Sequence, residues 1–176
     1  MVELSEKFDD SRVAHEVLIA LPRELNLSEQ INLVKDYVRD CFVRLGMCAD
    51  IAIHDKRNGN PHAHILLTTR AVTYGGFTVK IREWDKHKSL LKWREQWADA
   101  LNRVFERMGL DDRVSHESYK VQGIDKKPAI HLSKGVLALE RRGIQTERGN
   151  INREIIRERE EMERKRQRSR EYDRGR

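Results

Sequence analysis

Apolar positions near the start of the chain change from a strand-like run to a helical spacing. Residues 12–21 (RVAHEVLIAL) are rich in Val, Ile and Leu and precede Pro22, so we expect a strand that stops at the proline. From Ile31 to Leu45 the apolar residues recur every three or four positions, which predicts a helix. Asn26 to Glu29 has the pattern of a capping box, with Asn26 or Ser28 as N-cap, and Gly46 is placed to end the helix.

Two further segments show an alternation of side chains between two faces. Residues 48–54 (CADIAIH) and 62–69 (HAHILLTT) show this period of two, and the polar segment DKRNGNP separates them. Two strands joined by a short turn-rich segment are most simply an antiparallel hairpin. We therefore predict a hairpin with its turn at residues 55–61.

The rest of the chain alternates between helical patterns and turn signals. The segment 75–86 is irregular or contains a short strand, and a helix is expected over about residues 88–108, ended by Gly109. We expect loop over 110–132, then a helix from about Ser133 that breaks near Gly143 and Gly149. The last 24 residues carry ten Lys or Arg and seven Asp or Glu, so a solvated helix or a partly disordered tail is expected.

The composition limits the class of protein. The chain has 176 residues, 38% apolar and 36% charged, which suits one modest core with a charged extension. A net charge of +6 and a pI near 9.4 favour a polyanionic partner. Two cysteines without a C-x-x-C spacing give no disulfide framework, and neither an apolar signal segment nor a membrane-spanning run is visible. We expect a soluble protein of a reducing, intracellular compartment.

Three of the seven histidines fall in the predicted hairpin. The period of two sends His62 and His64 to one face of their strand, and His54 ends the neighbouring strand on a face that it can share with them. Three imidazoles within about one cross-strand spacing, roughly 5 Å, suit a divalent transition ion and leave coordination positions free for a substrate oxygen. Asp50 points to the same face and Asp55 is read as a turn residue.

The spacing alone leaves other interpretations open. A surface patch that senses pH or contacts nucleic acid would also gather histidines, and a lone histidine on a strand is more often a core or surface residue than a ligand.

The sequence of this hairpin, HDKRNGNPHAHILLTTR, closely resembles the three-histidine motif of the MobA/MobL family of plasmid mobilisation relaxases. The likeness extends to SRVAHEVLIALPREL, to SHESYKVQGIDKKPAIHLSK and to ERRGIQTERGNINREI, and it covers roughly residues 2–156. It implies an α+β fold with an antiparallel sheet flanked by helices. It also implies that one strand of DNA is nicked at an origin of transfer, where a tyrosine attacks the phosphodiester and keeps the 5′ phosphate.

The resemblance assigns roles to individual residues. His54, His62 and His64 match the three ligands of a divalent ion, Mg or Mn, and Glu16 in AHEV matches a supporting acidic residue. A second acid two residues later in many family members is Leu18 here. We expect single-stranded origin DNA and relaxosome accessory proteins as partners, in the bacterial cytoplasm.

The family's nucleophilic tyrosine lies well upstream of the strand at 12–21, and none is found there. Only eleven residues precede Arg12, and MVELSEKFDD looks like the end of a helix. We therefore expect an N-terminally truncated relaxase-like domain at residues 1–132, followed by a charged helical C-terminal extension at 133–176. The chain alone would then be inactive, or it would use another tyrosine, Tyr74 or Tyr119. Tyr37 is expected at the edge of the core, and Tyr172 in the charged tail is the least suited.

Three other activities compete with that of a relaxase. The chain could be a DNA-binding remnant without catalysis, a hydrolase that uses water in place of tyrosine, or an interaction arm built on its charged C-terminal helix.

The remaining candidate residues have ordinary structural interpretations. We expect packing roles for the tryptophans and Cys41, and structural or surface roles for the other histidines. We expect a basic edge beside the histidine face, formed by Arg70, Lys80, Lys56 and Arg57. This edge either contacts phosphates or is an ordinary solvated surface. The histidines meant are His15, His116 and His131, and the tryptophans are Trp84, Trp93 and Trp97.

Overall fold

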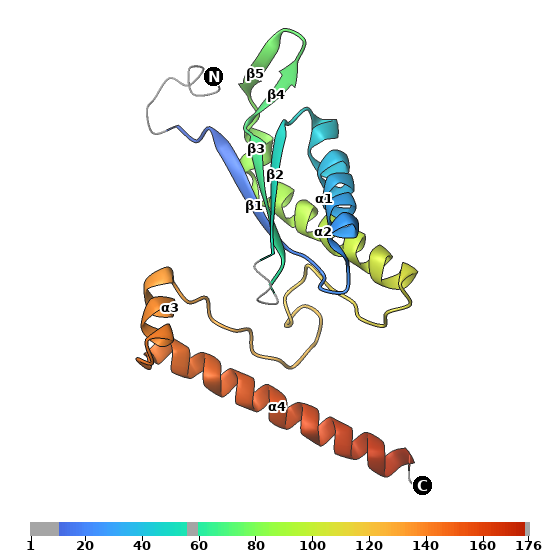
Figure 1. The fold of residues 1–176 in the computed structure, drawn as a ribbon, viewed down its shortest axis with the longest axis vertical. Helices are drawn as coiled ribbons and strands as arrows, with labels where there is room; N and C mark the ends of the chain where they lie inside the picture. The colour runs from blue at the N-terminus through green and yellow to red at the C-terminus, as the bar shows by residue number, and fades with distance from the viewer. Residues whose placement is uncertain (1–10, 56–59, 175–176) are drawn as a thin grey trace. The chain divides into compact units, whose positions relative to one another are not determined.

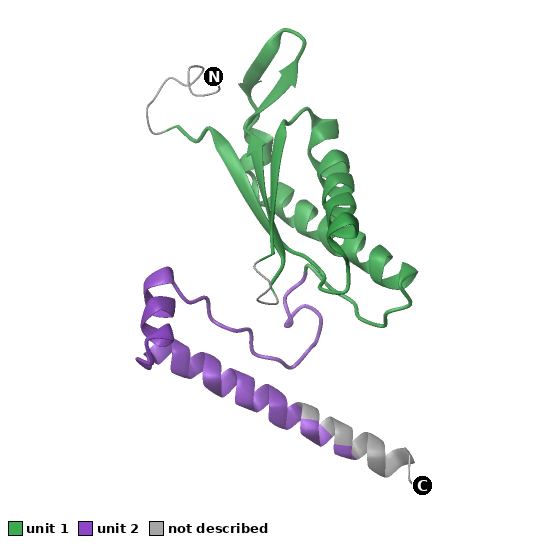
Figure 2. Ribbon diagram, in the orientation of Figure 1, with its two compact units in different colours: residues 1–116 green, residues 117–176 purple. Residues whose placement is uncertain are grey.

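The structure is a computed structural model that describes residues 11–55 and 60–174. Figure 2 shows its two compact units, residues 1–116 and 117–176. The predicted N-terminal helix end at residues 1–10 lies outside the described residues. The division after residue 132 that the sequence suggests stays a prediction. Across the described ranges, every helix is too short or too charged to pass through a lipid bilayer.

A three-stranded antiparallel sheet forms the centre of the first unit. Its order is β1 (Ala14–Ala20), β3 (His62–Thr68), β2 (Ala49–His54), so that β3 lies in the middle (Figure 1). The predicted hairpin of β2 and β3 is confirmed, with His54 opposite His62 and Ala52 opposite His64. On the other side Leu18 lies opposite His64, and Glu16 opposite Leu66.

Two helices pack on one face of this sheet. They are α1 (Leu27–Cys41) and α2 (His87–Arg107), which lie beside each other in Figure 1. Ala63, Ile65 and Leu67 of β3 point to them and are at most 1% exposed. The core they enter is completed by side chains of β1, of α1 and its C-terminal end, and of α2: Ile19, Val34, Val38, Phe42 and Trp93.

Helix α1 begins and ends by local signals. The Asn26 side chain accepts a hydrogen bond from the Glu29 backbone N–H, and the Glu29 carboxylate accepts one from the Asn26 backbone N–H, which confirms the capping box. The α-helix ends at Cys41, earlier than the spacing predicted, and a 3-10 turn η2 (Val43–Leu45) continues to Gly46. Gly46 has φ +94°, and a Cβ there would lie 2.9 Å from the Ala71 Cβ, so glycine is required.

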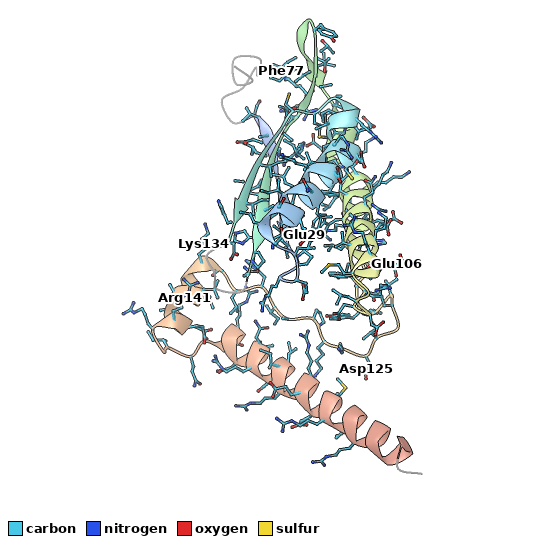
Figure 3. All side chains as sticks on the ribbon, turned by 45° about the vertical axis from the view of Figure 1, so that its right-hand side comes forward. Glu29, Phe77, Glu106, Asp125, Lys134 and Arg141 are labelled. Atoms are coloured by element: carbon cyan, nitrogen blue, oxygen red, sulfur yellow. The ribbon has the colours of Figure 1, made fainter. Side chains whose placement is uncertain are left out.

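A second hairpin extends from the end of β3 and was not predicted as such. It consists of β4 (Arg70–Thr73) and β5 (Gly76–Lys80), and it lies beyond the C-terminal end of β3 (Figure 1). Phe77 marks this hairpin in Figure 3. The 3-10 turn η3 (Arg82–Asp85) then leads into α2, which agrees with the predicted helix.

The second unit begins with an irregular segment and ends in two helices. These are α3 (Lys134–Arg141), capped by Ser133, and α4 (Glu147–Arg174). The predicted break at Gly143 is confirmed, but the one at Gly149 is wrong because Gly149 lies in the first turns of α4. A Cβ on Gly149 would overlap the Glu140 carboxylate, so close packing rather than helix termination explains this glycine.

Candidate metal and DNA site

The three histidines of the motif converge on the face of the sheet that no helix of the first unit covers. His62 and His64 alternate with the buried residues of β3, and His54 reaches the same face from β2. Their ring centroids are 5.4 Å apart for His54 and His62, 5.3 Å for His62 and His64, and 4.8 Å for His54 and His64. The hairpin register thus brings together rings that are up to ten positions apart in the sequence.

Two of the rings are oriented by oxygen acceptors. Nδ1 of His62 lies 2.8 Å from the backbone oxygen of Asn60, and Nδ1 of His64 lies 2.6 Å from Oε1 of Glu16. A carbonyl or a carboxylate has no proton to donate, so both Nδ1 atoms carry the hydrogen in these contacts. In the neutral ring with this tautomer, the Nε2 lone pair is the one that a ligand can use. Glu16 comes from β1, so each of the three strands contributes to the site.

The donor set fits a divalent ion. One nitrogen from each histidine lies within 4.8 Å of the others. Two nitrogens bound to one ion at about 2.1 Å are at most about 4.2 Å apart, so a small rotation of the rings is enough to bind it. Imidazole nitrogens are ligands for most first-row divalent ions, and a ring held through its other nitrogen is the usual arrangement at metal sites.

The face around the histidines also carries exposed apolar side chains. Leu18 is 61% and Leu66 is 50% exposed, and both share the face with His64. Asp50 also lies on this face, as predicted, but it pairs with Leu66 and no hydrogen bond joins it to a histidine in the described part of the chain. An open apolar surface beside polar ligands suits the flat bases of an unpaired nucleic-acid strand.

Comparison with known proteins identifies the family of this chain. The sequence model of the MobA/MobL family matches residues 1–142. The chain belongs to the MobA/MobL family. The resemblance drawn from the motifs is thereby confirmed, and the α+β fold agrees with it.

MobA/MobL-type relatives come from several bacteria. "Conjugal transfer protein TraA" of Agrobacterium fabrum is 35% identical over 82% of this chain and 15% of its own length. "Mobilization protein A" of Escherichia coli is 32% identical over 81% of this chain and 23% of its own length. The chain thus spans less than a quarter of either relative.

A solved structure also shares the fold. It comes from work on the molecular basis of vancomycin resistance transfer in Staphylococcus aureus. Its TM-score is 0.61 at 33% identity, and the match covers 67% of this chain and 64% of the other.

Neither tyrosine of the first unit lies beside the histidines of this MobA/MobL chain. The Tyr37 side chain is buried in the core, where its hydroxyl donates to the backbone oxygen of Trp93 at 3.0 Å and burial raises its pKa. Tyr74 is fully exposed at the turn of the β4–β5 hairpin. It comes ten positions after His64, beyond the ends of both β3 and β4.

The other two tyrosines belong to the second unit. Tyr119 lies under the guanidinium of Arg159, whose Cζ is 5.9 Å from the ring centroid. The side chain of Tyr172 lies outside the described residues.

Arg70 and Lys80, two of the four residues of the predicted basic edge, are not beside the histidines. Arg70 and Lys80 pair across the second hairpin, beyond the far end of β3, and Arg70 donates to the backbone oxygen of Thr78. β3 continues in the direction that carries these residues away from His62 and His64, which explains the difference. Lys56 and Arg57 lie outside the described residues.

The remaining predicted residues take structural or surface positions. Trp84, Trp93 and Cys41 are buried, as expected, and His131 is exposed. His15 is mostly buried, which lowers its pKa against the raising effect of Asp85. Asp85 had no predicted role, and its contact with Arg12 at 3.0 Å joins residues 73 positions apart, for which the sequence carries no local signal.

Proposed function

We propose that this chain is part of a mobilisation relaxase that cuts single-stranded origin DNA with the help of a divalent ion, Mg or Mn, in the bacterial cytoplasm. The observation that carries the proposal is the convergence of His54, His62 and His64 on the uncovered face of the sheet in a member of the MobA/MobL family. The basic pI near 9.4 supports a polyanionic substrate. Accessory proteins of the transfer complex stay a prediction.

The chain's own residues would position the ion and the DNA. His54, His62 and His64 would hold the ion through ring nitrogens, and Glu16 would keep His64 in the tautomer that binds. Such an ion polarises a phosphate and stabilises the charge that develops on it. Leu18 and Leu66 would receive bases of the strand on the face that carries the histidines.

The source of the nucleophile separates three versions of this function. The family resemblance implies a tyrosine, yet Tyr37 and Tyr74 are unsuited to the site within the first unit. Attack by water would give a hydrolase, and the absence of attack would give a DNA-binding remnant.

The test is incubation of the chain with labelled single-stranded oligonucleotides that tile the replicon carrying its gene, with Mn²⁺ or with EDTA. A denaturing gel then separates covalent adducts from free cut strands. An adduct supports a tyrosine relaxase, cut DNA without an adduct supports hydrolysis, and Mn²⁺-dependent binding without cutting supports the remnant. His64→Ala should abolish each Mn²⁺-dependent signal. If the signals persist in that variant, or if Mn²⁺ has no effect on any oligonucleotide, the proposal is wrong.

A further inference from the structure

A cavity of about 470 Å³ lies along the edge of β1 that faces away from β3, between this strand, η3 and the first turns of α2. In the described sheet β1 pairs only with β3, so its other edge borders the cavity. His15, Trp84 and Trp93 line it, and the rings of His15 and Trp93 meet edge to face with centroids 6.5 Å apart. The size is within the range of pockets that hold small planar ligands.

The cavity is bordered by both hydrogen-bond donors and hydrogen-bond acceptors. Arg12 and Lys86 offer donors, and Asp85 offers acceptor oxygens. Asp85 already accepts from Arg12 at 3.0 Å and lies 3.7 Å from Arg82, which offsets its charge. An inorganic anion would have no use for a carboxylate, whereas the edge of a nucleobase presents donors and acceptors side by side.

Glu16 is the residue that the cavity lining shares with the histidine site. Glu16 borders the cavity, and its carboxylate bonds to His64 on the open face. His15 and Glu16 are neighbours on an edge strand and point to opposite faces, so a strand of DNA that leaves the histidines over β1 arrives directly at the cavity.

From these observations we infer that the cavity between β1, η3 and α2 binds one unpaired nucleobase of the DNA strand whose phosphate lies at the histidines. The base lies beside Leu90 and against the exposed edges of the His15, Trp84 and Trp93 rings. Its own edge meets Asp85 and Arg12, and Lys86 contacts the adjoining phosphate. The inference rests on the DNA binding in the proposed function, but it does not depend on cutting.

Two adjacent leucines provide a matched test. Leu90 lines the cavity and Leu91 does not, and they are 39% and 41% exposed on α2. Leu90→Trp fills the cavity, while Leu91→Trp adds the same side chain outside it, and neither disturbs the core. Affinity for a fluorescent single-stranded oligonucleotide is measured by anisotropy in EDTA, so that the histidine site plays no part. Leu90→Trp should weaken binding roughly 5- to 150-fold, as expected for one stacked base, and Leu91→Trp should leave it unchanged.

A second measurement locates the base directly. The chain is mixed with an oligonucleotide that contains 5-iododeoxyuridine, and the complex is irradiated. The cross-linked peptides are then mapped by mass spectrometry. Cross-links are expected at His15, Trp84 or Trp93. Lys86→Ala should also lower the slope of log affinity against log salt by about 0.7, which Lys88→Ala should not do.

The outcomes separate this inference from the proposed function. Cross-links elsewhere, or equal effects of the two tryptophan substitutions, overturn the base pocket even if Mn²⁺-dependent cutting is found. Cross-links in the cavity with no effect of Mn²⁺ on any oligonucleotide leave the pocket intact and overturn the proposed function. If no DNA binds, both are wrong.

Discussion

Oε1 of Glu16 accepts a hydrogen bond of 2.6 Å from Nδ1 of His64, although 48 positions separate the two residues in the sequence. The contact crosses from β1 to β3 and joins a carboxylate to a ring that shares its open face with two other histidines. It orients His64 before any ligand arrives.

Removal of this carboxylate should weaken binding of a divalent ion. Glu16→Ala should raise the Kd for Co²⁺ or Mn²⁺ by roughly 10- to 100-fold, because His64 loses the acceptor that fixes its orientation. Glu16→Gln, which keeps an acceptor oxygen, should fall between. Isothermal titration measures the affinities. Asp50→Asn serves as control, since Asp50 lies on the same face without a bond to a histidine, and an equal loss there would contradict the orienting role.

Phe42 should be among the most costly residues to truncate. Its side chain is fully buried, and its ring contacts Tyr37 and Trp93 with centroids 5.4 and 5.2 Å away. Phe42→Ala should lower the free energy of unfolding by about 3–5 kcal/mol, as for other large core residues. Phe77→Ala, at an exposed position on the second hairpin, should cost well under half as much. Urea unfolding compares the two variants.

The two thiols should differ in reactivity. Burial raises the pKa of Cys41 to about 11, whereas Cys48 is exposed. Iodoacetamide at pH 8 should therefore modify Cys48 quickly and Cys41 only after unfolding. Mass spectrometry of digested protein reads both sites. Fast labelling of Cys41 in the folded chain would mean that helix α1 opens readily.

The contact between α3 and α4 should lose stability as the pH falls into the acid range. Hydrogen bonds from Arg153 and Thr146 lower the pKa of Glu140 from its ordinary 4.5 to about 2. A lowered pKa in the folded state stabilises it above the unfolded value, and that contribution is lost as the pH falls from 4.5 through about 2. The difference in Tm between the native chain and Glu140→Gln should thus be largest above pH 4.5 and vanish below about 2. Glu161→Gln, on an exposed side of α4, should show no such difference.

Tyr74 should have no part in cutting DNA. Because it lies at the far hairpin, Tyr74→Phe should leave any Mn²⁺-dependent adduct or cut strand unchanged on a denaturing gel. Tyr119→Phe is the comparison from the second unit. Loss of the adduct in the Tyr74 variant alone would require the hairpin of a second copy to reach the histidines.

The sequence predicts the histidine site well because its geometry is local. A period of two and a short turn determine which side chains of β2 and β3 share a face, and His54, His62 and His64 are all within that hairpin. The end of α1 and the second hairpin are harder to predict from the sequence. The 3-10 turn at Val43–Leu45 keeps the helical spacing of apolar residues, and β4 is only four residues long, although the pair Gly75–Gly76 is a recognisable turn signal.

Contacts between distant segments explain what the sequence does not predict. Glu16 was assigned a supporting role through the family resemblance alone, since nothing in its neighbourhood indicates that it reaches His64. The residue type alone makes Gly149 look like a helix breaker. Its actual role, close packing against Glu140, depends on how two helices meet, which the local sequence does not show. The cavity at the β1 edge likewise requires η3 and α2 to be in place.

In strand β3 the same backbone register determines which side chains enter the core and which face the candidate metal site. Its odd-numbered residues Ala63, Ile65 and Leu67 are buried, and the intervening positions carry His62 and His64. Loss or gain of one residue within this strand would direct the imidazoles into the interior and the aliphatic side chains into water. Selection for a stable interior therefore also preserves the alignment of the two histidines, whatever substitutions accumulate elsewhere in the chain.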